Sequence, residues 1–320
     1  EKLYLVDRAS LMTDLVVEFV KEFNIALQRV SNDSTTIKAF GRYPGRTKTG
    51  LELKKGNSKD HRPDLKQLVF SLSIAADGAV PIHYKCYPGN VTDDKTHIET
   101  WNTLRQITGC PDFLYVADSK LCTDEQLSYI VNQGGRVVTI IPETWNEVES
   151  FKEQLRKTKK AKDIIWRRRN PGRNDQKEYF SAFRGDYSTT KRGYRIHWIY
   201  SSEKRKRDRQ SREKHLKKVE QCLAVLNGKI NKRALKTKKL IKQAAQQIIK
   251  EHKLEKFFHI TIGTITERSK VQIGPGRPGK NTQYGTHVNR LFTLSWTQKK
   301  QLIKQQAQTD GVFPLLCTDK

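Results

Sequence analysis

The stretch FLYVADSKLCTDEQLSYIVNQGGRVVTII, residues 113–141, decides the fold of this chain. It opens with a continuous apolar run, residues 113–117, of the kind that forms a strand buried on both faces. That run ends at Asp118. A second apolar run, residues 136–141, closes the stretch and has the same strand-like character.

The segment between these two runs has the pattern of a helix. Thr123 is a favourable N-cap residue, and apolar residues follow it at helical spacing, at Leu127, Ile130 and Val131. Gly134 and Gly135 then end the helix. A strand, a helix and a second strand in this order place the two strands parallel, with a right-handed connection.

The residues before this unit predict three antiparallel strands. Residues 67–76 and 79–87 are strand-like runs separated by Asp77 and Gly78, a strong hairpin signal. Residues 26–30 form an earlier strand that leads to Asp33. Together with the parallel unit, these strands predict an α/β fold with a mixed five-stranded sheet and flanking helices.

Apolar stripes predict which faces of the helices are buried. The first stripe recurs every four residues, at Leu11, Leu15, Phe19 and Phe23. Two later helices have apolar sides formed by Leu216, Val219, Leu223 and Leu226 and by Leu240, Ala244 and Ile248.

Two aspartates, Asp33 and Asp118, are the candidate catalytic residues, since each ends a strand-like run. In open sheets of this kind ligands gather at the strand ends, so we expect both carboxylates there, close enough to share divalent metal. The structural alternative is that Asp33 forms an Asx-turn and that Asp118 caps the turn into the following helix.

Charge is the strongest bulk feature of the chain. There are 61 Lys+Arg against 34 Asp+Glu, a formal net charge of +27. Residues 152–170 hold nine Lys/Arg against two acids, residues 203–218 nine against three, and residues 229–256 ten against two. A single basic run is usually a solvated helix face. Three runs of one sign repel each other unless a polyanion relieves them, which favours nucleic acid as the partner.

The candidate DNA-binding residues lie in the basic runs and in the loop at residues 274–279. They are Arg167, Arg168, Arg169, Lys204, Arg205, Arg207 and Arg277. The loop, with the sequence GPGRPG, could insert its arginine into a minor groove, although a plain surface turn is the alternative.

Composition divides the chain into three segments. Residues 1–144 form the first part of the α/β core, and residues 145–309 form a basic α+β insertion with strand-like runs at 178–183 and 194–200. Residues 310–320 return to the core, because residues 311–317 resume its apolar style.

The sequence gives little support for a membrane protein or for a disulfide-rich protein. No stretch approaches the roughly 20 apolar residues that span a bilayer, and the first residues lack a signal-peptide pattern, so we expect a cytoplasmic protein with no membrane partner. The 5 cysteines include no Cys-x-x-Cys, which suits a reducing compartment. A zinc site from His83, Cys86 and two later cysteines is an irregular alternative.

Five motifs along the chain carry a family resemblance. They are SKDHRPDLKQLVF at 58–70, DGAVP at 77–81, GNVTDDKTHIETW at 89–101, YVADS at 115–119 and DGVFPLL at 310–316. These motifs closely resemble bacterial insertion-sequence transposases of the DDE type, and they span nearly the whole chain. The resemblance implies a ribonuclease H-like catalytic domain interrupted by an insertion.

The resemblance also implies a site and a reaction. In such enzymes the first acid of the triad lies at the end of strand one and the second after strand four, positions that match Asp33 and Asp118. These carboxylates would hold two Mg²⁺ ions, which Mn²⁺ can replace, for phosphodiester cleavage and strand transfer. The implied partner is double-stranded DNA, both transposon ends and target, bound by a homodimer in association with the bacterial nucleoid.

The third acid of the family, a Glu, lies on a helix after the strand that residues 311–317 match, whereas this sequence stops at Lys320. We therefore expect an incomplete catalytic domain that binds DNA and cleaves it poorly or not at all. Asp310 is expected in a turn and Asp319 in a fraying end, so neither replaces the Glu. Two alternatives stay open: another ribonuclease H-like nuclease, such as a resolvase, and a non-catalytic DNA-binding remnant.

Overall fold

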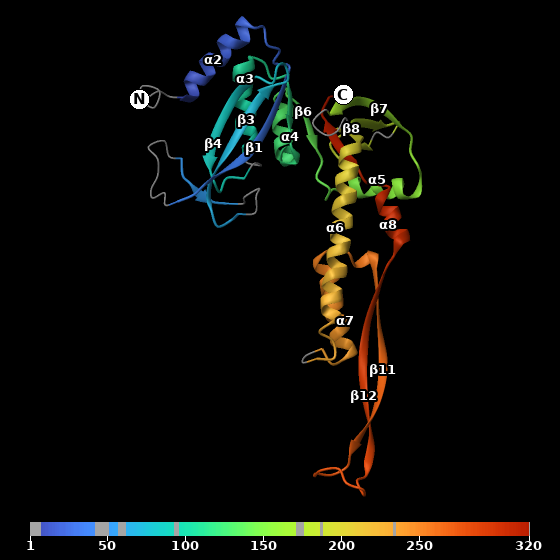
Figure 1. Cartoon of the computed structure of the whole chain (residues 1–320). Coiled ribbons are helices and arrows are strands. Elements are labelled where there is room, and N and C mark those ends of the chain that lie inside the picture. Colours follow the sequence, from blue (N-terminus) through green and yellow to red (C-terminus); the bar gives the residue numbers. More distant parts are fainter. Residues whose placement is uncertain are drawn as a thin grey trace.

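The computed structural model describes residues 8–41, 51–56, 62–92, 96–170, 176–185, 188–232 and 235–319. Within these residues the chain is mixed α/β, with one 11-stranded sheet and a separate two-stranded sheet (Figure 1). Parts of two motifs quoted above, residues 58–61 and 93–95, lie outside the described residues.

The first half of the chain builds one side of the large sheet. Its elements are α2 (Arg8–Glu22), β1 (Arg29–Ala39), β2 (Lys54–Lys55), β3 (Lys66–Ala75), β4 (Pro81–Pro88), α3 (His97–Thr108), β5 (Leu114–Ala117), the short 3-10 helix η2 (Ser119–Leu121), α4 (Asp124–Asn132) and β6 (Arg136–Ile140).

Within this half the strand order is β4-β3-β1-β5-β6, and the directions agree with the sequence prediction. β3 pairs antiparallel with β1 and with β4. β5 pairs parallel with β1 and with β6. The predicted hairpin and the predicted parallel unit are both confirmed. Thr123 caps α4 as expected, since its side chain accepts a hydrogen bond from the Gln126 backbone N–H at 3.3 Å.

The second half of the chain extends the sheet and adds a helical body. Its elements are α5 (Asn146–Lys157), β7 (Lys162–Asn170), β8 (Gln176–Phe183), β9 (Ser188–Thr189), β10 (Arg195–Ser201), α6 (Ser202–Asn227), α7 (Lys238–Glu251), η4 (Glu255–Phe257), β11 (Phe258–Gln272), β12 (Tyr284–Gln298), α8 (Lys300–Ala307) and β13 (Val312–Cys317).

The five predicted strands are not the whole sheet, which corrects the expected strand number. β13 pairs antiparallel with β6 on one side and with β10 on the other, and β8 and β7 follow. Strand periodicity in the sequence does not say which strands become neighbours. The edge of β6 is therefore covered by a strand that comes far later in the chain.

Two hydrophobic clusters hold the described part of the chain together. The larger one runs under the sheet and contains Trp101, Tyr115 and Trp198, all at most 1% exposed. The other joins α6, α7 and the base of the β11–β12 ribbon. Strands β7, β8 and β10 lie in the expected insertion yet belong to the main sheet. The division into segments 1–144, 145–309 and 310–320 stays a prediction.

The burial of the helices corrects two of the predicted stripes. On α2 the buried residue is Val16, whereas Leu15, Phe19 and Phe23 are 47%, 50% and 66% exposed. On α7 the buried side is formed by Ile241, Ala245 and Ile249, one position along from the predicted stripe. Both helices offer adjacent apolar stripes, and packing selects between them. The predicted stripe of α6 is confirmed.

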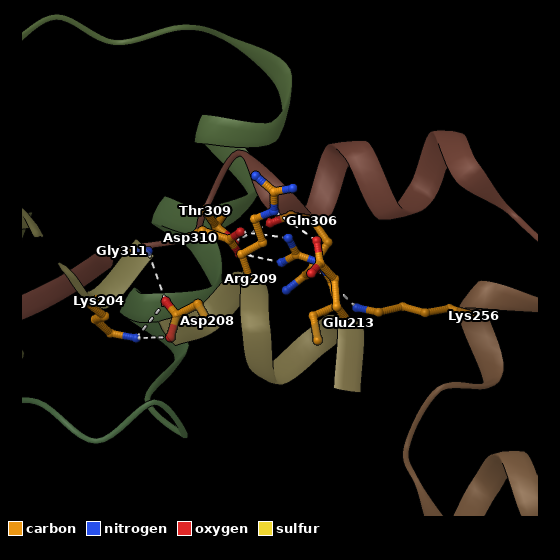
Figure 2. Close-up of polar contacts among 10 residues, drawn as sticks. Lys204, Asp208, Arg209, Glu213, Lys256, Gln306, Thr309, Asp310 and Gly311 are labelled. Carbon is orange, nitrogen blue, oxygen red and sulfur yellow. Dashed lines mark hydrogen bonds and ion pairs between the residues drawn. The ribbon is translucent and has the colours of Figure 1, made fainter. Parts of the chain in front are cut away.

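A polar junction joins α6 to the start of β13 (Figure 2). Arg212 donates two hydrogen bonds to the Asp310 carboxylate, at 2.6 and 2.8 Å, and these side chains are only 13% and 8% exposed. Asp208 accepts from the Gly311 backbone N–H at 2.9 Å and pairs with Lys204. The predicted turn at Asp310 is confirmed, but its buried partner Arg212 was not foreseen.

We predict that Asp310→Asn destabilises the protein strongly. It leaves the Arg212 charge buried without its anion, and removing one member of a buried pair typically costs about 3–5 kcal/mol. Asp319→Asn is the control, since Asp319 pairs with Arg136 at 3.4 Å and both side chains are about two-fifths exposed. Its cost should stay below about 1 kcal/mol. Urea unfolding measures both, and equal losses would contradict the prediction.

We also predict that Gly311→Ala is much more harmful than Gly274→Ala. Both glycines have positive φ, 81° and 96°, so both substitutions carry backbone strain of about 1–2 kcal/mol. Only at Gly311 does a Cβ meet neighbours, at 2.6 Å from the Ser201 carbonyl oxygen and 2.9 Å from the Arg205 Cβ. The two melting temperatures should differ clearly, and similar values would show that the junction can relax.

Candidate active site and nucleic-acid interface

Asp33 lies inside β1 and not at its end, which corrects the sequence prediction. The parallel pairing between β1 and β5 stops at Ser31 and Val116. β1 nevertheless continues, because β3 stays hydrogen-bonded to it as far as Ala39. The exposed side chain of Asp33 thus lies just beyond the point where β1 and β5 separate.

Asp118 directly follows β5, as predicted. Its carboxylate caps η2 by accepting a hydrogen bond from the Lys120 backbone N–H at 2.9 Å, so the structural alternative is also observed. Its carbonyl oxygen accepts from the Thr139 hydroxyl on β6 at 2.6 Å. Asp118 is therefore held at its carbonyl oxygen by Thr139 and at its carboxylate by the Lys120 N–H, while its side chain remains exposed.

The strand register relates the two aspartates. Each lies two residues beyond the pair Ser31 and Val116, and Asp118 keeps an extended backbone with φ −70° and ψ −177°. Residues two apart on a strand share a face, and neighbouring strands lie about 4.8 Å apart. If this register is continued two residues past the last pair, we expect Asp33 and Asp118 at one level and on one face. We call them the acidic pair.

Asn32 anchors β1 beside the acidic pair. It is buried, and its amide donates to the Ser71 hydroxyl at 2.9 Å, the Ser73 hydroxyl at 3.0 Å and the Leu72 carbonyl at 3.2 Å. These bonds tie β1 to β3 next to Asp33. The sequence carried one signal for this role, a polar amide at a position where strand alternation expects an inward side chain.

The acidic pair offers a metal ion oxygen ligands, not sulfur or nitrogen ligands. Mg²⁺ is commonly bound through one or two carboxylates, with water and phosphate oxygens completing its shell, and two exposed carboxylates fit that need. Across the described ranges, no three His, Cys, Asp or Glu side chains gather as a metal cluster. The zinc alternative is weakened further because His83 and Cys86, three apart on β4, point to opposite faces.

The predicted arginines of β7 separate onto two faces. Arg167 lies opposite Tyr179 and Arg169 opposite Lys177 on β8, so these four side chains share one face of the sheet. Arg168 lies on the other face, where it pairs with Glu178 at 2.9 Å. Arg167 and Arg169 form no ion pair with any residue in the described part of the chain.

A basic cavity of about 580 Å³ continues the face of Arg167 and Arg169 toward α6. Its lining includes Lys177, Tyr179, Tyr200, Ser202, Arg205, Lys206 and Arg209, and at one end it borders the Arg212–Asp310 pair of the junction. Arg205 donates to the Tyr200 hydroxyl at 3.5 Å, and this hydrogen bond raises the pKa of its guanidinium. The Lys162 ammonium lies 3.2 Å from the centroid of the Tyr200 ring. We call this cavity with Arg167 and Arg169 the basic face.

The remaining predicted DNA-binding residues have different surroundings. Lys204 is bound in the junction by Asp208. Arg207 is exposed on α6, and Arg277 is exposed at the far tip of the β11–β12 ribbon, distant from the sheet in Figure 1. No signal in the sequence indicated Lys177, Tyr179 and Tyr200 as site residues. They lie on strands, and no motif near them shows that α6 packs beside these strands to form a cavity.

The acidic pair and the basic face lie along the same edge of the sheet. β13, β10 and β8 alternate in direction after β6, so the carboxyl ends of β5, β6, β10 and β7 and the amino ends of β13 and β8 all meet there. Five strand spacings separate β5 from β7, which carries Arg167 and Arg169, or about 24 Å. Carboxylates and unpaired arginines are thus within one turn of a DNA duplex.

No helix within the described ranges is both long and apolar enough to cross a membrane. No family model matches this chain, and no curated protein matches it. Among solved structures, a piggyBac transposase synaptic complex with hairpin DNA is similar at 9% identity and a TM-score of 0.29, covering 61% of this chain and 40% of that one.

A second similar structure is a Ciona intestinalis endonuclease V variant in complex with a 23mer DNA, at 11% identity and a TM-score of 0.21, covering 56% of this chain and 78% of that one. The chain thus spans less than half of the piggyBac transposase that it matches. Both similar proteins are enzymes in complex with DNA, and likeness at these TM-scores does not establish a shared fold.

Proposed function

We propose that this chain is the catalytic part of a DDE-type DNA transposase with a ribonuclease H-like sheet. The order β4-β3-β1-β5-β6 and its strand directions support this reading. If the two-residue β2 is left out, β5 is the fourth strand, so the second acid follows strand four as the family resemblance implies. The first acid is on strand one, although inside the strand and not at its end. One observation carries the proposal: the acidic pair and the basic face share one sheet edge.

In this proposal each group has a physical role. The basic face would hold the DNA backbone, since phosphate contacts position a duplex without reading its sequence. Asp33 and Asp118 would supply oxygen ligands from strands anchored by Asn32 and Thr139. When bound there, Mg²⁺ would neutralise charge at the phosphate and activate water. Water attack at phosphorus would break the P–O3′ bond and leave a 5′-phosphate and a 3′-hydroxyl. That hydroxyl would then attack a target phosphodiester, forming a new P–O bond while the 3′-oxygen of the target strand leaves as its hydroxyl.

Metal binding tests the acidic pair without requiring turnover. We expect the protein to bind Mn²⁺ in the presence of duplex DNA, as measured by electron paramagnetic resonance, and Asp33→Asn or Asp118→Asn to weaken that binding at least tenfold, since each removes a charged oxygen ligand. Asp14→Asn, an exposed carboxylate on α2, is the matched control and should change nothing.

Unchanged Mn²⁺ affinity in both variants would contradict the proposed site and leave a DNA-binding protein. If binding is lost as expected, a strand-transfer assay separates transposase from other nucleases. A product that joins transposon end to target, even at the poor turnover expected from the sequence, supports transposition, whereas cleavage without joining indicates a resolvase-like enzyme. Homodimer formation with DNA stays a proposal, which light scattering of the complex tests.

DNA affinity tests the basic face. Arg167→Gln with Arg169→Gln should reduce the slope of log K against log salt concentration by about two, since each lost phosphate contact lowers it by about 0.9. Arg168→Gln is the control on the same strand, because Arg168 faces away and pairs with Glu178. Fluorescence anisotropy with a duplex measures the slopes, and equal effects of both variants would count against a directional face.

A further inference from the structure

The β11–β12 ribbon is packed only at its base. The two strands pair along their whole length, from Phe258 opposite Gln298 to Gln272 opposite Tyr284. Near the base, Ile260, Ile262 and Trp296 pack against the cluster of α6 and α7. Beyond about residue 264 the ribbon leaves the helices and extends away from the molecule (Figure 1). Large side chains there, such as Val271, Tyr284 and Val288, are 50–54% exposed.

The register divides the ribbon into two different faces. Directly opposed residues of an antiparallel pair share a face, and so do residues two apart on one strand. Arg268, Lys270 and Arg290 therefore lie on one face, with Thr266, Val288 and Tyr284. The opposite face contains Glu267, Ser269, Val271, His287 and Asn289. All Lys and Arg of the paired strands are on the first face, and their only acid is on the second.

The charges of the first face are not neutralised within the described part of the chain. Arg268, Lys270 and Arg290 are exposed and form no ion pair there. Arg290 is opposite Thr266 and therefore diagonal to Arg268, a spacing of about 7–8 Å between Cα atoms. Like charges at this distance repel each other unless an anion lies against them.

The tip of the ribbon adds cations to the same end of the molecule. Arg277 and Lys280 are exposed in the loop that joins the strands. The loop is held by hydrogen bonds from the Gln272 amide to the Gly276 carbonyl at 3.0 Å and from the Gly279 N–H to the Thr282 hydroxyl at 2.7 Å. Its arginine is therefore presented on an ordered turn.

The shape of the ribbon favours a DNA duplex over a small anion as the bound ligand. A two-stranded β-ribbon fits the major groove of B-DNA, which is about 12 Å wide. The segment from Thr266 to Gln272 spans roughly 20 Å, or more than half of a helical turn. A small anion would contact one cation, whereas a duplex backbone can contact the whole row.

We propose that the Arg268–Lys270–Arg290 face of the ribbon docks a DNA duplex, with the ribbon in the major groove and the tip arginine on the adjoining backbone. The inference deepens the proposed function, since it takes DNA as the partner, but it does not depend on the acidic pair. The ribbon is then a second DNA contact, separate from the basic face and joined to it through α6.

A charge-conserving swap tests which face matters. The variant R268S/S269R/K270V/V271K moves two cations to the opposite face while composition and net charge stay the same. With a 30-bp duplex and the full chain, we expect the salt slope to fall by about two and affinity at 0.1 M salt to fall on the order of 50-fold, as for two lost phosphate contacts. Unchanged slope and affinity would overturn the proposal.

A second pair of variants guards against misfolding of the swap. Thr286→Glu places an acid opposite Lys270 on the proposed face, whereas His287→Glu places the same acid on the other face. The first should weaken DNA binding at least tenfold more than the second. If both act equally, or if Thr286→Glu abolishes self-association in light scattering without changing DNA affinity, the ribbon is not a DNA contact. Since no variant touches Asp33 or Asp118, Mn²⁺ binding measured at saturating duplex DNA should be unchanged in all of them.

Discussion

The pairing of β13 with both β6 and β10 is the constraint on which the rest of the structure depends. Without β13 the sheet would end at β6, and the strands that carry the basic face would form a separate body. With it, β13 runs antiparallel to both β6 and β10, so β6 and β10 point in the same direction. The carboxyl ends of β5 and β10 therefore lie at the same edge of the sheet. Gly311 and the buried pair Arg212–Asp310 fix where that strand begins.

The sequence predicted those features of the sheet that depend on residues close together in the chain, and it missed those that depend on distant segments. In residues 113–141 the apolar runs, the cap at Thr123 and the paired glycines lie within a few residues of what they determine, and the parallel unit formed as expected. The neighbours of β13 could not be read in this way, because its partner β6 is separated from it by most of the second half of the chain. Asp33 lies inside β1 for a related reason, since strand length there is set by β3.

Burial shows the same limit on a smaller scale. Helical spacing correctly indicated that α2 and α7 are helices, yet each has neighbouring apolar stripes, and the one that packs is chosen by tertiary contact. On α6 the apolar residues form a single stripe among charged residues. Only one face could therefore be predicted to be buried, and that prediction is confirmed. Polar contacts gave still less signal, because nothing in a basic run distinguishes Arg212, which is buried against an acid, from Arg207, which is exposed.

That distinction explains how a chain with a net charge of +27 holds together. At the junction, Lys204 and Arg212 each have a carboxylate within hydrogen-bond distance, so there the cations stabilise the fold. On β7 and on the ribbon, cations such as Arg167 and Arg268 lie in rows on one face, and the described residues on the same face of these strands include no acid. The cations in such rows repel each other in the free protein, and a bound polyanion relieves this repulsion. Release of counterions from DNA further increases the favourable free energy of binding. The junction therefore pairs its cations with acids, whereas the described faces of Arg167 and Arg268 lack acids and are suited to a phosphate backbone.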